Sequence, residues 1–157
     1  MRSVSSLELR LLRFSIAIVY IWFGALKIFD LSPAHDLVVR TITHFFPPSF
    51  VPVLGFWEVL IGACFLHRRL LPLGVALFAM HVPGTMTPLV VLQDLSFIQF
   101  PFVPSLVGQY IVKNLVLIAA VIAIAKAVIL DGRFPLAGTR HARVLRLRLA
   151  YPHQRAA

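Results

Sequence analysis

The sequence predicts an all-α integral membrane protein, a four-transmembrane-helix bundle with an amphipathic helix at its outer interface. Of its 157 residues, 59% are hydrophobic and 13% are charged, whereas soluble domains have roughly 45–50% apolar and about 25% charged residues. Apolar runs of about 20 residues, the length of a helix that crosses the hydrocarbon core, recur four times. The formal net charge of +9 is distributed unevenly between the segments that join these runs.

The four predicted spans fill one domain, residues 1–132. The first span ends in bulky residues instead of the small residues of a signal-peptide cleavage site, so we interpret it as a retained helix. A basic tail, residues 133–157, follows the last span. In chain order the spans cover about 11–29, 50–66, 70–92 and 107–130.

The segment between the first two spans has the pattern of an interfacial helix. Ser32 is a favourable N-cap and Pro33 a favourable first helical residue. Apolar residues recur near helical spacing from Leu37 to Phe46, and Pro47-Pro48 ends the pattern. We therefore expect an amphipathic helix that lies in the outer membrane interface.

The basic residues predict an orientation. Segments rich in Lys and Arg resist translocation and stay on the cytoplasmic side. Twelve of the 15 Lys and Arg residues lie in or beside the termini, in the 67–69 turn or at the end of the fourth span, and the opposite loops, 30–49 and 93–106, contain Arg40 alone. We therefore expect both termini to be cytoplasmic.

Several functional classes are excluded by what the sequence lacks. The single cysteine, Cys64, cannot form an internal disulfide, a CxxC pair or a multi-cysteine metal site. There is no nucleophile elbow, P-loop or HExxH motif. The basic residues are not accompanied by a folded nucleic-acid-binding module. We expect no metal site, no intrinsic cofactor, no nucleic-acid partner and no catalysis by this chain on its own.

The polar residues inside the spans are the main candidates for function. Ionisable groups are costly in the bilayer unless they are paired, hydrated or close to an interface, and they commonly mark functional sites. The first and third spans run outward and the second and fourth run inward, so the six candidates share the outer half of the bundle. We expect them to line a polar ligand-binding pocket: Lys27, Glu58, His81, Thr85, Lys113 and Asn114.

A purely structural role is the alternative for the same residues. A buried Lys–Glu pair with an Asn can set the register of packed helices. Lys27 and Lys113 are also near enough to the outer surface for their ammonium groups to reach it. The residues alone therefore leave a pocket and a packing device as two open readings.

The basic tail has a separate expected role. Its arginines are interleaved with Val and Leu residues, a pattern that favours contact with anionic lipid headgroups. Docking to an acidic partner subunit is the alternative for this segment. The expected lipid- or partner-binding residues are Arg140, Arg143, Arg146 and Arg148.

Four short segments, one in each span, form a combined pattern: residues 22–27 (WFGALK), 55–62 (GFWEVLIG), 80–88 (MHVPGTMTP) and 108–117 (GQYIVKNLVL). This pattern resembles the DoxX-like superfamily of small four-helix membrane proteins, including its RclC/YkgB-like branch. The resemblance covers nearly the whole chain except the arginine-rich tail. It implies a compact four-helix domain in the bacterial cytoplasmic (inner) membrane, with Lys27, Glu58, His81, Lys113 and Asn114 at the polar positions of that family.

The resemblance also implies an association with membrane redox chemistry and redox stress. We therefore expect an accessory, non-catalytic subunit of a redox or quinone-linked membrane complex, with quinone as the possible ligand of the polar pocket. The alternative is a structural subunit that anchors a larger membrane assembly. Transport is less favoured, because no pair of broken-helix repeats is visible.

Overall fold

The computed structural model describes residues 6–130. The predicted tail with its four expected binding arginines lies outside this range. Four helices are long and apolar enough to cross a membrane, which confirms the predicted helical class and the number of candidate spans. These helical segments are Leu7–Ile28, Pro48–Leu66, Arg68–Val91 and Leu106–Val128.

The first two spans are nearly uninterrupted helices. The first is α1, Ser6–Ile28. The second begins with a 3-10 turn, Pro48–Phe50, which leads directly into α3, Val51–Leu66. Proline favours the first turn of a helix, where its missing N–H is not needed, and this explains why the second span begins at Pro48.

The third and fourth spans are each composed of shorter segments. After the 3-10 turn Arg68–Leu70, α4 covers Leu71–Met86 and continues through Pro83, and α5, Pro88–Val91, follows after Thr87. In the fourth span α7, Leu106–Val112, is separated from α8, Asn114–Ala125, by Lys113 alone. The span ends in a π-helical turn, Lys126–Leu130.

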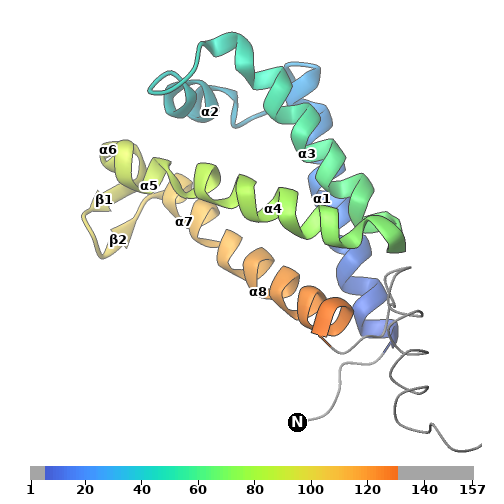
Figure 1. The fold of residues 1–157 in the computed structure, drawn as a ribbon. Helices are drawn as coiled ribbons and strands as arrows, with labels where there is room; N and C mark the ends of the chain where they lie inside the picture. The colour runs from blue at the N-terminus through green and yellow to red at the C-terminus, as the bar shows by residue number, and fades with distance from the viewer. Residues whose placement is uncertain (1–5, 131–157) are drawn as a thin grey trace, which may run out of the picture.

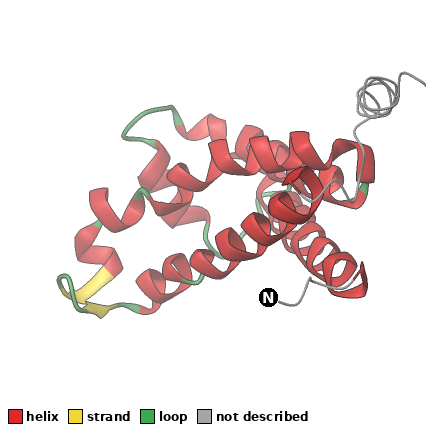
Figure 2. Cartoon of the chain, turned by 60° about the horizontal axis from the view of Figure 1, so that its bottom comes forward, coloured by secondary structure: helices red, strands yellow, loops and turns green. Residues whose placement is uncertain are grey.

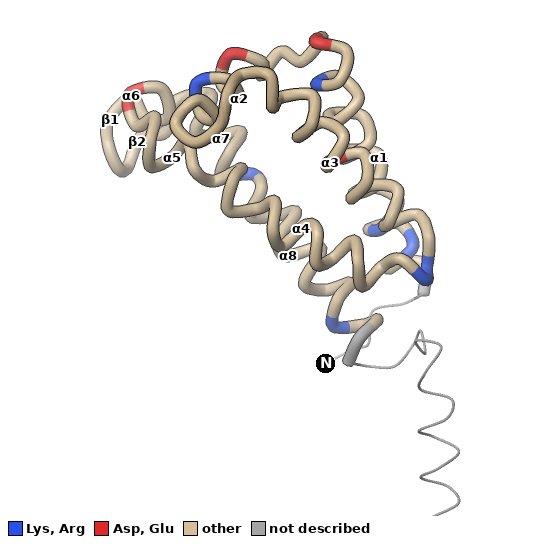
Figure 3. Tube along the Cα trace, turned by 45° about the horizontal axis from the view of Figure 1, so that its top comes forward, with Lys and Arg blue, Asp and Glu red and all other residues tan. Residues whose placement is uncertain are grey.

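The four spans form two antiparallel helix pairs, α1 with α3 and α4 with α8 (Figure 1). The pairs meet where α1 begins, α3 turns into α4 and α8 ends, and we call this the terminal end. They separate toward the opposite end, which we call the loop end, where α2, His35–Ile42, connects α1 to α3 (Figures 1 and 3).

The hydrophobic core lies at the terminal end. Its residues come from the first two thirds of α1, the second half of α3, the first half of α4 and the end of α8. At the loop end Val51 and Ile111 are also buried, but they lie outside this cluster. The cluster consists of Leu9, Ile16, Ala17, Tyr20, Ile61, Phe65, Leu71, Phe78, Val121, Ile124, Ala127 and Val128.

The loop end carries short elements of mixed structure (Figure 2). A helix, α2, is present where the interfacial helix is expected. It begins at His35 instead of at Pro33, so the expected cap is wrong, and it ends at Ile42, before Phe45 and Phe46. The hydroxyl of Ser32 accepts a bond from the Ala34 N–H at 3.3 Å within a turn, and α2 itself has no side-chain cap.

A small hairpin lies between the third and fourth spans. After α6, Gln93–Ser96, strand β1, Phe97–Gln99, pairs antiparallel with β2, Val103–Pro104. Ser105 fixes this hairpin to the helices beside it, because its hydroxyl donates to the Leu95 carbonyl at 2.6 Å and accepts from the Gly108 N–H as the N-cap of α7. The apolar sequence of this loop did not indicate strands.

Candidate functional site

An ion pair between Lys27 and Glu58 joins α1 to α3. The Lys27 Nζ donates to both carboxylate oxygens of Glu58 at 2.5 Å. Glu58 is buried and Lys27 is largely shielded, with 7% of the Glu58 side chain and 11% of the Lys27 side chain exposed. The sequence places these two residues at similar depths, and the structure shows that they are direct partners.

Close approach of α1 and α3 makes this pair possible. A Cβ atom added to Gly55 would lie 2.9 Å from the Cβ of Lys27, so Lys27 starts at the level of Gly55, one turn from Glu58 on the same helix. Side chains on a helix point back toward its N-terminus. Lys27 therefore extends toward the terminal end of the bundle, where Glu58 lies.

His81 brings a third helix into the site. Its Nε2 lies 3.1 Å from the Glu58 Oε1, and only 4% of its side chain is exposed. Glu58 thus contacts a basic group from α1 and one from α4, and we call Lys27, Glu58 and His81 the polar triad. No hydrogen bond to the other ring nitrogen of His81, Nδ1, is present within residues 6–130.

Tyr20 lies on the core side of the triad. Its ring meets the His81 ring edge-on, with centroids 5.8 Å apart, and it also contacts Phe78 at 5.7 Å. The triad therefore rests directly on the packed core. Sequence reasoning missed Tyr20, although its position seven residues before Lys27 on α1 was a signal that both lie on one helix face.

The other predicted pocket residues are not hydrogen-bonded to the triad. The Thr85 hydroxyl donates to the Val82 carbonyl of its own helix at 2.8 Å. The Lys113 ammonium is exposed and lies 4.7 Å from the centre of the Tyr110 ring. Asn114 is half-buried on the face of α8 that carries Ile118, and its amide has no hydrogen-bond partner in the part of the chain that the structure describes. Of the six predicted residues, Lys27 and His81 therefore both contact Glu58, and Thr85, Lys113 and Asn114 are not bonded to them.

Arg13 is a second buried cation that sequence reasoning did not single out. Its guanidinium donates to the Phe65 carbonyl from Nε at 3.1 Å and from Nη2 at 2.9 Å, and to the Leu66 carbonyl at 3.0 Å. These carbonyls end α3 and have no partner within that helix. Arg13 therefore caps α3 at the terminal end and has a structural role, whereas the orientation argument treated it only as a topological charge.

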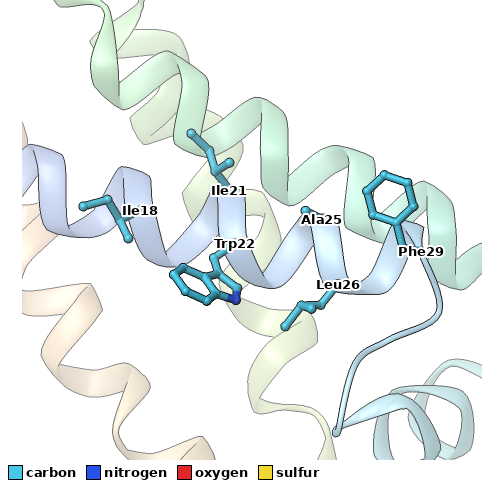
Figure 4. Close-up of a pocket in the computed structure, with 6 residues that line it drawn as sticks. All are labelled: Ile18, Ile21, Trp22, Ala25, Leu26 and Phe29. Carbon is cyan, nitrogen blue, oxygen red and sulfur yellow. The ribbon is translucent and has the colours of Figure 1, made fainter.

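Two surface grooves among the described residues have apolar linings, and neither lining includes a residue of the triad. One runs along α1 on the face opposite Lys27, lined by Ile18, Ile21, Trp22, Ala25, Leu26 and Phe29 (Figure 4). Another lies between α4 and α8, from Val75 to Pro83 and from Ile118 to Ala125. Apolar side chains on these outward faces are expected where lipid surrounds a helix bundle.

Residues 6–130 contain no group of three or more His, Cys, Asp or Glu side chains placed to hold a metal ion. The triad has one carboxylate, one imidazole and one ammonium group, and an ammonium group cannot be a metal ligand. Its chemistry is hydrogen bonding and proton exchange.

No protein-family model, curated protein or solved structure matches this chain.

Proposed function

We propose that this chain is an accessory integral membrane subunit of a redox or quinone-linked complex, and that its polar triad binds a quinone headgroup. The resemblance to DoxX-like proteins supports the class of complex, and with it a place in the bacterial cytoplasmic membrane. The single observation that carries the binding site is the contact of Glu58 with both Lys27 and His81 at the edge of the apolar core.

The triad has the chemistry that a quinone headgroup requires. A quinone carbonyl accepts hydrogen bonds, and a quinol hydroxyl donates and accepts them. His81 has one ring nitrogen engaged with Glu58 and one without a partner in the described residues, so Nδ1 is available to a ligand oxygen. The Glu58–His81 contact offers a path for a proton between carboxylate and imidazole.

Burial makes these groups selective for a neutral headgroup. The Lys27 and Glu58 charges offset one another in the triad, and an additional unpaired charge would be costly to bury beside them. A neutral, hydrogen-bonding ring avoids this cost. Lipid-soluble quinones combine such a ring with an apolar body, which suits a site between membrane-spanning helices.

The test is quinone content after gentle purification. The wild-type protein, isolated with native lipid in nanodiscs, should yield close to one quinone per chain on solvent extraction. His81→Ala should lose it, and His44→Ala should retain it, because His44 is exposed and bonds only the Arg40 carbonyl of the loop end. No extractable quinone in the wild-type protein would overturn the binding proposal.

A test of Glu58 requires a variant that removes the carboxylate charge and still folds. We therefore pair Glu58→Gln with the double variant Lys27→Met/Glu58→Leu, which removes both charges and leaves apolar side chains of similar size. Loss of quinone from a double variant that remains folded supports a binding role. Retention of quinone in that variant contradicts it and favours a role of the ion pair in helix packing alone.

A structural anchoring subunit is the second candidate, and the Lys27–Glu58 bond favours it because each charge satisfies the other. This alternative predicts a partner protein that co-purifies with the chain and is lost when residues 140–148 are removed. It also predicts that the triad variants change stability while the amount of bound quinone is zero throughout.

A further inference from the structure

The groove between α4 and α8 has room for one narrow ligand. It extends from Val75 to Pro83 on α4 and from Ile118 to Ala125 on α8, and all of its lining residues are apolar. Its volume is about 310 Å³, which is at the lower end of the range for small-molecule sites. The lining therefore suits a single apolar chain.

The length of the groove suits a lipid chain from one leaflet. Ala125, which lines the groove at the end of α8, is followed directly by Lys126. Ile118, at the other end of the lining, lies eight residues before Lys126, a distance of about 12 Å along the axis of an α-helix. One leaflet takes half of a hydrocarbon core that is about 30 Å thick. An acyl chain with its headgroup near Lys126 therefore follows the groove through most of its leaflet.

Lys126 lies at the terminal end of this groove. Ile122 lines the groove, and Lys126 follows it by four residues on the same face of the helix. A long side chain on a helix lies over the turn that precedes it. The ammonium group of Lys126, an exposed residue, is therefore expected over the end of the groove.

The turn before α4 adds positive charge beside the same end. Arg68 and Arg69 are exposed in this turn, and the start of α4 packs in one cluster with the end of α8. Lys and Arg residues gather at the terminal end (Figure 3), and Glu8 is the one acidic residue there in the part of the chain that the structure describes. Both helices thus favour an anionic group at this end of the groove.

The groove along α1 lacks this charge. Its lining ends toward the loop end at Phe29, and the next residue is acidic, Asp30 (Figure 4). Its other end is Ile18, and the nearest exposed basic residue of α1 on that side, Arg10, lies eight residues earlier. The two grooves are thus similar in lining and differ in the charge beside them.

We propose that the groove between α4 and α8 binds one acyl chain of an anionic glycerophospholipid, whose phosphate lies between Lys126 and the Arg68-Arg69 turn. The apolar lining selects for the chain, and the cations select for a headgroup with net negative charge. This site is separate from the triad. It rests on the membrane location in the proposed function and not on quinone.

Lipid retention, measured by native mass spectrometry, tests the headgroup. Wild-type protein from nanodiscs with equal amounts of phosphatidylglycerol and phosphatidylcholine should retain one phosphatidylglycerol per chain. Lys126→Gln should lower the preference for phosphatidylglycerol about fivefold, because a basic residue near an anionic surface contributes about 1 kcal/mol. Lys113→Gln is the matched control, since it changes an exposed lysine of the same span near the loop end, and it should keep the preference. No preference in the wild type, or equal losses in the two variants, would overturn the proposal.

Filling the groove tests the site of the chain. Ala79→Phe adds a ring to the lining from an exposed position, and it should lose the retained lipid while the protein stays folded by circular dichroism. Ala25→Phe adds the same ring to the groove along α1 (Figure 4) and should retain the lipid. Equal retention in the two variants contradicts the assignment of the groove.

A photoreactive lipid locates the chain without any substitution. Phosphatidylglycerol with a diazirine on its acyl chain should label the groove segments of α4 and α8 more strongly than residues 18–29 of α1. Phosphatidylcholine with the same diazirine should label these segments alike. The same uniform labelling by both lipids would overturn the proposal.

Quinone extracted from the same samples separates this proposal from the proposed function. Retained phosphatidylglycerol without quinone supports the lipid site and removes the proposed ligand of the triad, and quinone without phosphatidylglycerol does the reverse. A wild-type dimer that Ala79→Phe converts to a monomer would show that a second copy fills the groove, and the lipid proposal would then be wrong.

Discussion

Gly24 of α1 and Gly55 of α3 lie directly against each other. A Cβ atom on Gly24 would be 2.5 Å from the Gly55 carbonyl oxygen, and one on Gly55 would be 2.7 Å from the Gly24 carbonyl oxygen. Each glycine precedes its charged partner by three residues, Gly24 before Lys27 and Gly55 before Glu58. The helix contact and the ion pair thus depend on each other. Because neither glycine has a side chain, the two helices approach closely enough for Lys27 to bond Glu58.

This relationship predicts that Gly24→Ala destabilises the protein. Backbone atoms cannot move aside as a flexible side chain can, and overpacking of this kind costs about 1–3 kcal/mol. Unfolding in mixed micelles, followed by circular dichroism, measures the change. Gly84→Ala is the control, and since it meets no neighbour it should cost nothing. Equal losses in the two variants would refute the role assigned to the Gly24–Gly55 contact.

Removal of one partner of the triad's ion pair should be more harmful than removal of both. Glu58→Gln leaves the Lys27 ammonium, 11% exposed, opposite a neutral amide, and breaking a buried pair from one side costs about 3–5 kcal/mol. Lys27→Met/Glu58→Leu should recover most of this stability because no unpaired charge remains. Unfolding in mixed micelles compares the stabilities of the two variants. A double variant that is no more stable than Glu58→Gln contradicts the prediction.

Arg13→Ala should loosen the end of α3. The substitution leaves the Phe65 and Leu66 carbonyls without their guanidinium donor, and hydrogen bonds to charged groups contribute roughly 1.5–3 kcal/mol. Hydrogen exchange should accelerate at the α3–α4 turn. Arg69→Ala, at an exposed position in that turn, serves for comparison, and similar exchange in both variants would show that Arg13 does not cap the helix.

Ser105→Ala should release the hairpin from its neighbours. The variant loses the bond to the Leu95 carbonyl and the N-cap of α7, and loss of a cap costs about 1 kcal/mol. Faster hydrogen exchange from Phe97 to Pro104 is the expected result. Ser49→Ala changes an exposed serine and should leave this segment unaffected; protection that persists in Ser105→Ala rules the anchoring role out.

The proposed orientation predicts opposite labelling of two loops. In intact cells carrying Cys64→Ala, a membrane-impermeant thiol reagent should label Thr43→Cys in the loop between α2 and α3. It should not label His67→Cys in the turn before α4 until the membrane is permeabilised. The reverse pattern would place the termini outside and overturn the assignment from the basic residues.

The helical class and the four candidate spans could be predicted from the amino-acid sequence. These features depend on local hydropathy, because a run of about 20 apolar residues can be recognised without knowing which other segments pack against it. The small hairpin could not be predicted in this way, because the bond from Ser105 to the Leu95 carbonyl joins it to an earlier segment. The start of α2 differs from the prediction because the Ser32 hydroxyl bonds the Ala34 N–H in a turn that precedes the helix.

Which polar residues contact one another depends on how the helices pack. Depth along a helix follows from residue number, but partnership depends on how each helix is rotated about its axis and on how closely two axes approach. Glycine contacts bring α1 and α3 together, so Lys27 reaches Glu58, and α4 turns His81 toward the same carboxylate. Lys113 has a predicted depth in the bundle similar to that of Lys27, but its side chain is exposed and lies over the Tyr110 ring.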